Sequence, residues 1–278
     1  MSPMRPVDAV EPIVAGEVRI KEAQVAGRGP NHVRHWRTML SRSWTSVLPV
    51  YCWLIRHPGG TILVDTGPKP TESWWYPRYH FYFPLSYRTR AGPNGGLVGG
   101  LEATDVGVDD IDAIVLTHCH ADHGEGLELV PDPPVYVEEN EYAYTHSLRG
   151  RYWGAHSSCA PSRERATLVS LTDEPVGPFD RSHALSDFSG VSIVPTPGHT
   201  AHHCSVVVEG DGPTVLLAAD ACLSLDQLET RRVDGVATRG RAGRDSLERI
   251  DRWRREEDVI VLPSHDERGF DQLVDARD

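Results

Sequence analysis

The sequence is poor in cysteine and has no two cysteines in a CxxC spacing. Its five cysteines are odd in number and widely separated: Cys52, Cys119, Cys159, Cys204 and Cys222. This argues against a disulfide framework and against a structural zinc knuckle, since both need closely matched cysteines. We expect each cysteine to be a small, buried apolar residue.

Long apolar runs are also missing. No stretch approaches the roughly 20 residues that a membrane-spanning helix needs. The N-terminal segment has early prolines and several charges in place of the apolar core of a secretory signal. Internal repeats and low-complexity tracts are absent as well. The sequence therefore predicts a cytoplasmic protein with no membrane partner.

Basic residues are fewer than acidic residues. The 28 lysines and arginines face 40 aspartates and glutamates, which gives a formal net charge of -12 and a pI of about 5.6. A surface of this sign repels phosphate backbones, so we expect no nucleic-acid partner. The 278 residues, of which 39% are apolar and 24% charged, have an ordinary globular composition and are ample for a buried core.

The expected elements begin with strands and continue as an alternation of strands and helices, which indicates an α/β fold. The turn residues His57–Gly60 join the first two strands into a hairpin. The expected strands are Val47–Arg56, Thr61–Val64, Ala113–Leu116, Pro134–Val137, Val191–Val194, Ser205–Val208, Thr214–Ala218 and Val259–Leu262, and the expected helices are Glu138–His146 and Asp245–Arg255. We expect an aromatic-rich insert near 70–100 and an irregular insert near 147–185 to interrupt this pattern.

Polar residues recur at one kind of position, just past the end of an expected apolar strand. These residues are Asp65, His118, His199, Asp220 and His265. Loops at strand ends are where rigid scaffolds place chemistry. The regularity therefore predicts that residues far apart in the sequence build one site.

The segment THCHADHG carries four potential metal ligands in close succession. In an extended chain, positions two apart point the same way, so His118 and His120 can bind one ion while Cys119 points away. Asp122 and His123 follow where the chain turns and can face a second ion. Imidazole and carboxylate suit zinc, iron or manganese. A surface histidine cluster is the alternative.

Three further fragments complete the expected site. A Pro/Gly turn after a strand aims His199 at a fixed point, and His203 is expected to support a ligand from behind. Asp220 ends an apolar strand, where a carboxylate is costly unless it is paired or metal-bound. Taken alone it would be a structural Asp, but beside the other fragments we expect it to bridge both ions. The same reasoning makes His265 a ligand.

At these residues the chain resembles the metallo-β-lactamase-fold hydrolases. The matching pieces, in the family's order, are LVDTG (Leu63–Gly67), THCHADHGEG (Thr117–Gly126), PTPGHTAHH (Pro195–His203), AAD ending at Asp220, and PSHD (Pro263–Asp266). Among subgroups, the spacing, the VYVEENEYAY segment and the short tail after His265 look most like the N-acyl-homoserine lactonases.

The resemblance implies a single domain over residues 1–278, with a four-layer αβ/βα sandwich of two mixed sheets flanked by helices. It also implies the division of the ligands. His118, His120 and His199 would hold one ion, Asp122, His123 and His265 the other, and Asp220 would bridge them, while Asp65 would orient a ligand imidazole. One departure is Leu223, which occupies a place where those lactonases usually carry a Tyr or another polar group.

Two divalent ions would bring four positive charges. Asp122 and Asp220, the expected catalytic residues, remove two of them and a bridging hydroxide removes one, so the site favours an anionic intermediate. Metal coordination lowers the pKa of the shared water to roughly 7. We therefore expect a zinc-dependent hydrolase in which the bridging hydroxide opens a lactone or ester and Asp122 moves the proton.

The substrate is expected to be a small molecule with an apolar portion. Its apolar wall would consist of Trp74, Trp75, Phe81, Phe83 and Leu223. A satellite cluster or the contact of a homodimer explains the same aromatic run equally well. The alternatives for function are a thioesterase, a phosphodiesterase or a β-lactamase of the same fold, and a metal-containing binder without catalysis, which Leu223 keeps open.

Overall fold

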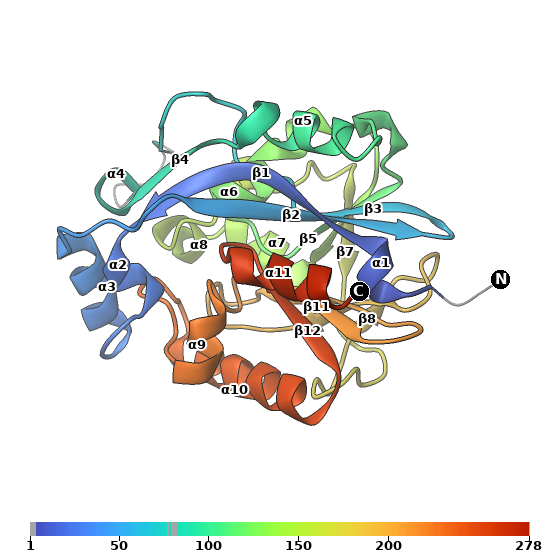
Figure 1. The fold of residues 1–278 in the computed structure, drawn as a ribbon. Helices are drawn as coiled ribbons and strands as arrows, with labels where there is room; N and C mark the ends of the chain where they lie inside the picture. Colours follow the sequence, from blue (N-terminus) through green and yellow to red (C-terminus); the bar gives the residue numbers. More distant parts are fainter. Residues whose placement is uncertain (1–3, 77, 79–82, 278) are drawn as a thin grey trace.

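The computed structural model describes residues 4–76, 78 and 83–277 of the chain. Its centre is a pair of mixed β-sheets (Figure 1). The first has the order β4 (Tyr87–Ala91), β1 (Val10–Ile20), β2 (Leu48–His57), β3 (Gly60–Val64), β5 (Ala113–Leu116), β6 (Val135–Glu138) and β7 (Ala166–Val169). The second has the order β12 (Val259–Pro263), β11 (Thr214–Ala219), β10 (Cys204–Val208), β9 (Val191–Pro195) and β8 (His183–Ala184).

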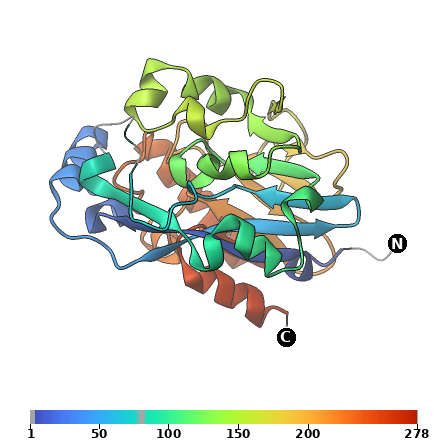
Figure 2. The same ribbon diagram turned by 90° about the horizontal axis from the view of Figure 1, so that it is seen from above.

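Helices cover the outer faces of both sheets, as the two perpendicular views show (Figures 1 and 2). The described α-helices are α1 (Pro6–Ala9), α2 (Glu22–Val25), α3 (Asn31–Leu40), α4 (Phe83–Ser86), α5 (Leu97–Glu102), α6 (Ala121–Gly124), α7 (Glu139–Thr145), α8 (Leu148–Tyr152), α9 (Leu225–Thr230), α10 (Gly240–Glu256) and α11 (Glu267–Asp275). Short 3-10 turns are η1 (Pro93–Gly95), η2 (Val108–Asp110), η3 (Glu125–Leu129) and η4 (Ser157–Cys159). The predicted four-layer sandwich is confirmed.

The strands are apolar on both faces because each sheet is covered on both sides. Trp53 and Ile55 of β2 face the second sheet and pack in one core with Val206 and Leu217. The alternate residues, among them Leu54, face the helical layer outside. A third core joins α10 to the outer face of the second sheet, with Leu247, Ile250 and Trp253 buried at helical spacing.

The predicted hairpin is confirmed, with β2 and β3 paired antiparallel. Several elements were not expected from the sequence. β1 contains a proline and a glycine, and its register shifts between Val14 and Gly16, which hides the alternation of a regular strand. The segment 147–185 contains α8, η4, β7 and β8, and the last two form edges of the two sheets. Within the described residues, no helix has the length and apolarity to span a membrane.

Candidate metal centre

The expected ligands meet at one edge of the sandwich because the strands that carry them end there. β3 runs parallel to β5, and β11 runs parallel to β12, so the carboxyl ends of each pair lie together. Asp65 and Asp220 immediately follow β3 and β11, while His118 and His265 lie two residues beyond β5 and β12. His199 reaches the same place from the Pro/Gly loop after β9.

The structure brings together all seven residues predicted as ligands. Three groups have ligand atoms within 4.8 Å of one another: His118, His120 and His199; His118, His123 and Asp220; and Asp122, His123 and His265. The first and last groups are the two sets that the family resemblance implied. Their assignment as metal ligands is still a prediction.

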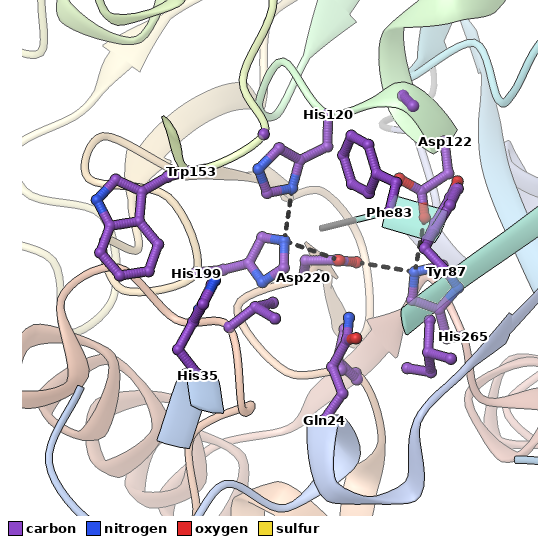
Figure 3. Close-up of a pocket in the computed structure, with 15 residues that line it drawn as sticks. Gln24, His35, Phe83, Tyr87, His120, Asp122, Trp153, His199, Asp220 and His265 are labelled. Carbon is purple, nitrogen blue, oxygen red and sulfur yellow. Dashed lines mark hydrogen bonds and ion pairs between the residues drawn. The ribbon is translucent and has the colours of Figure 1, made fainter. Parts of the chain in front are cut away.

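Asp220 lies between these two sets. Its Oδ2 is 3.3 Å from His199 Nε2, whereas its Oδ1 is 3.3 Å from His265 Nε2 and 3.4 Å from His123 Nε2. Figure 3 shows the Asp220 carboxylate between His199 and His265. One oxygen thus faces each set, which is the arrangement that a carboxylate shared by two cations requires.

The outer nitrogen of most of these imidazoles is held by a partner behind it. His123 Nδ1 lies 2.7 Å from Asp65 Oδ2, and His199 Nδ1 lies 3.2 Å from Asp234 Oδ2. His265 Nδ1 is 2.8 Å from the carbonyl oxygen of Pro49. Such partners fix the ring and its tautomer, so that the other nitrogen carries a free lone pair.

The buried atoms that lack partners point to cations. Among the described residues, His118 Nε2, His123 Nε2 and Asp220 Oδ1 are buried and accept or donate no hydrogen bond. Each such atom costs about 1–3 kcal/mol when left unpaired. Three of them converging on one point, with only nitrogen and carboxylate donors around, fit divalent cations such as zinc.

The electrostatics of the centre also favour added positive charge. Burial, followed by the neighbouring His123, holds the pKa of His118 well below its usual range, so this imidazole is neutral. Burial opposes ionisation of Asp220, but the imidazoles around it, His265 first, hold the pKa of this carboxyl well below its usual range. At His123, burial lowers the pKa, but the Asp220 carboxylate and then the Asp65 carboxylate outweigh it and raise the pKa well above its usual value. These carboxylates attract positive charge, which protons or metal ions can supply.

The two predicted supporting residues differ in how they reach the centre. Asp65 accepts hydrogen bonds from the Thr117 backbone N–H and hydroxyl at 2.9 and 2.8 Å, besides its contact with His123. His203 contacts Thr196 Oγ1 at 2.9 Å through Nδ1, and its ring centre lies 4.9 Å from that of His118. Sequence reasoning missed Asp234, which follows no strand and carries no local signal.

A cavity opens above the centre (Figure 3). It is lined by Ile20, Gln24, His35, Phe83, Tyr87, His120, Ala121, Asp122, Trp153, Gly154, His199, Asp220, Leu223, Val236 and His265. Phe83 and Leu223, both predicted for the substrate pocket, lie on its wall. Apart from the predicted ligands and Ala121, the walls come from four separate parts of the chain: the end of β1 through α3, the region of α4 and β4, the end of α8, and the segment between β11 and α10.

Trp74 and Trp75, which were predicted for the substrate pocket, are not among the residues that line this cavity. Trp75 pairs with Thr89 along the free edge of β4, with hydrogen bonds of 2.9 Å in both directions between their backbones. Trp74 lies against the Arg90 guanidinium, 4.7 Å from the ring centre. Trp75 thus extends the sheet edge, whereas Phe83 lies on the cavity wall. The predicted pocket residue Phe81 lies outside the described residues.

Comparison with known proteins gives consistent relatives. A family model described as the metallo-beta-lactamase superfamily matches residues 45–265. The N-acyl homoserine lactonase AttM of Rhizobium radiobacter is 24% identical over 226 residues, covering 79% of this chain and 82% of the relative. The N-acyl homoserine lactonase AiiB of Rhizobium rhizogenes is 25% identical over 268 residues, covering 95% of each chain.

Solved structures share the fold. A mutant of AiiA from B. thuringiensis with N-decanoyl-L-homoserine bound at the active site superposes with a TM-score of 0.74 at 21% identity, covering 98% of this chain and 97% of the other. AidC, a dizinc quorum-quenching lactonase in complex with a product, gives a TM-score of 0.66 at 14% identity, covering 95% of this chain and 90% of the other.

Proposed function

The chain belongs to the metallo-beta-lactamase superfamily, as its motifs led us to expect, and is a metal-dependent hydrolase; we propose that it opens a lactone ring. The observation that carries this proposal is the convergence of seven predicted ligand side chains, four of which have a buried atom without a hydrogen-bond partner among the described residues, beneath a largely apolar cavity. Relatives named as N-acyl homoserine lactonases, which match most of the chain, support the choice of a lactone.

We propose that the centre holds two divalent cations, with zinc as the first candidate and iron or manganese as alternatives. One set would be His118, His120 and His199, the other would be Asp122, His123 and His265, and Asp220 would be shared. Bound there, the cations would supply Lewis acidity, which ionises a water molecule and polarises the substrate carbonyl.

The protein's own residues would then position the substrate and handle the proton. Asp122 lies on the cavity wall, with Oδ2 3.7 Å from His265 Nε2. From there its carboxylate can accept a proton from the attacking water and return it to the leaving alkoxide. Phe83, Trp153 and Leu223 form apolar surface beside it, which excludes water and suits a substrate with an apolar substituent.

The alternatives from the sequence differ in substrate. Leu223 is buried on the cavity wall and offers no hydrogen bond, so thioesters, phosphodiesters and β-lactams belong in the same assay as lactones. Structures similar in fold hold N-acyl homoserine products with apolar chains, which makes such lactones the first to test. Assembly as a homodimer stays a prediction.

The test combines metal analysis with a substrate panel. We expect the purified protein to bind two equivalents of divalent metal per chain and to hydrolyse acyl-substituted lactones faster than the other three classes. Asp220→Ala should lose bound metal and, with it, most of the wild-type kcat. Asp112→Ala, at an exposed carboxylate that accepts the Thr61 backbone N–H, is the control. A fully metallated protein that turns over another class but no lactone would refute the proposal.

A further inference from the structure

Tyr87 combines deep burial with a hydroxyl that has no partner. It is the first residue of β4, and its side chain is only 5% exposed. Its ring packs against Phe83, with ring centres 5.3 Å apart, and belongs to the same apolar cluster as Leu223. Within the described part of the chain, the Tyr87 hydroxyl makes no hydrogen bond.

A buried tyrosine hydroxyl usually finds a hydrogen-bond partner, because leaving it unpaired is costly. The hydroxyl of Thr89, two residues further along β4, donates to the carbonyl oxygen of Glu17 at 3.1 Å. It also lowers the pKa of Tyr87, against the larger effect of burial, but no group of the described residues has hydrogen-bond geometry to the Tyr87 hydroxyl. A polar group that enters the cavity could therefore supply the missing partner.

The position of Tyr87 fits a role in the reaction. It lines the cavity above the metal centre, and Figure 3 shows it beside Asp122 and His265. Among the described residues that line this cavity, Tyr87 is the one with a hydroxyl group. Leu223, in the same cluster, cannot donate a hydrogen bond.

The Tyr87 hydroxyl also stays protonated and so remains a hydrogen-bond donor. Burial, and after it the Asp122 and Glu125 carboxylates, raise the pKa of Tyr87 well above its usual value. The phenol therefore keeps its proton near neutral pH. Nearby carboxylates disfavour a phenolate but leave a neutral O–H free to donate.

We propose that the Tyr87 hydroxyl donates a hydrogen bond to the carbonyl oxygen of the substrate as that oxygen becomes negative, which makes Tyr87 a catalytic residue. The proton stays on Tyr87 throughout, so no group has to restore it. This inference rests on the proposed lactone hydrolysis and assigns its carbonyl donor to β4. A donor placed for the transition state raises kcat more than it tightens substrate binding.

The test compares Tyr87→Phe with a matched control. Tyr51→Phe removes the hydroxyl of another strand tyrosine of similar burial, 6% exposed, that lies in the core between the sheets and does not line the cavity. With an acyl-substituted lactone, we expect Tyr87→Phe to lower kcat about 100-fold while KM changes less than about threefold. Metal content should be unchanged. Its thermal midpoint should equal or exceed that of the wild type, because an unpaired buried hydroxyl is removed.

The outcomes separate this inference from the proposed function. A kcat of Tyr87→Phe within about twofold of an active wild type would overturn the role of Tyr87 alone, on the scale expected for one donor. A loss of kcat together with lost metal or a lowered midpoint would mean a structural role and would overturn it too. A metallated wild type without lactonase activity overturns the proposed function and, with it, this inference.

Discussion

The contact between Asp65 and His123 allows a sharp prediction about metal affinity. Asp65 is 1% exposed and accepts three hydrogen bonds, two from Thr117 and one from His123 Nδ1 at 2.7 Å. Asp65→Asn keeps the shape but replaces one acceptor oxygen with an NH₂ group. In either orientation of the amide, its NH₂ group faces an N–H or O–H group that donates to Asp65 in the wild type.

The consequence depends on the orientation, and both orientations weaken the centre. With its NH₂ toward His123, the introduced amide would favour the tautomer with the proton on Nε2, which points at Asp220 Oδ1 3.4 Å away and can no longer bind a cation. With its NH₂ toward the Thr117 backbone N–H, two donors oppose each other at a buried site. One lost buried pairing costs about 1–3 kcal/mol, and loss of an orienting partner typically weakens metal affinity 10–100-fold.

The measurement is competition for metal against a chromophoric chelator, which resolves the two binding steps. We expect Asp65→Asn to weaken one step about 10–100-fold and to leave the other less affected, since Asp65 reaches His118 only through the Thr117 hydroxyl, whereas it contacts His123 directly. Asp112→Asn, which changes an exposed carboxylate at 2.7 Å from the Thr61 backbone N–H, should leave both steps unchanged. Equal affinities in wild type and Asp65→Asn at both steps would show that Asp65 does not orient a ligand.

Three further predictions concern pH, substrate size and metal removal. Burial raises the pKa of Glu141 to about 7, above its unfolded value, so its stabilising contribution is present below pH 4.5 and lost as pH rises through about 7. In Glu141→Gln, the amide can still accept a hydrogen bond from the Cys119 N–H and donate one to the Thr200 hydroxyl. The free energy of unfolding of the metal-free variant should therefore rise relative to that of the metal-free wild type between pH 5 and 8, by up to roughly 3 kcal/mol in thermal melts. A difference that does not change with pH would refute this. Trp153→Ala should raise KM about tenfold for long-chain lactones and little for short ones, because it removes apolar wall, and an unchanged chain-length profile would contradict that. Chelation should lower the thermal midpoint of the wild type, as expected for ligands that bind only the folded state, but not that of Asp220→Ala.

The convergence of the candidate metal ligands could be predicted from the sequence because these residues follow local rules. His118, His120, Asp122 and His123 lie within one short segment, where spacing alone indicates which side chains share a direction. The remaining ligands follow apolar strands, and parallel strands deliver their carboxyl ends to one edge. Asp220 was the weakest of these by itself, and it became a convincing prediction only beside the other fragments.

The cavity could not be predicted in the same way, because its walls depend on packing between distant segments. Gln24 and His35 reach it from α2 and α3, and Trp153 from the end of α8. Of the aromatic residues predicted for the apolar wall, Phe83 lines the cavity, whereas Trp74 and Trp75 do not. Apolar character does not tell which residues of a run pair along a sheet edge, as Trp75 does, and which turn inward.

The candidate ligands and the cavity wall determine different properties: the ligands set the type of reaction, and the wall sets the choice of substrate. The ligands are fixed at the ends of buried strands, and partners such as Asp65 and Asp234 fix their rings from outside the cavity. Few substitutions are tolerable there without loss of metal. The cavity wall, in contrast, is assembled from segments that can change without disturbing those strands. The reaction type can therefore be inferred from the superfamily, whereas the substrate must be inferred from the side chains at positions such as Tyr87 and Leu223, where this chain places a hydroxyl and an apolar group on the same wall.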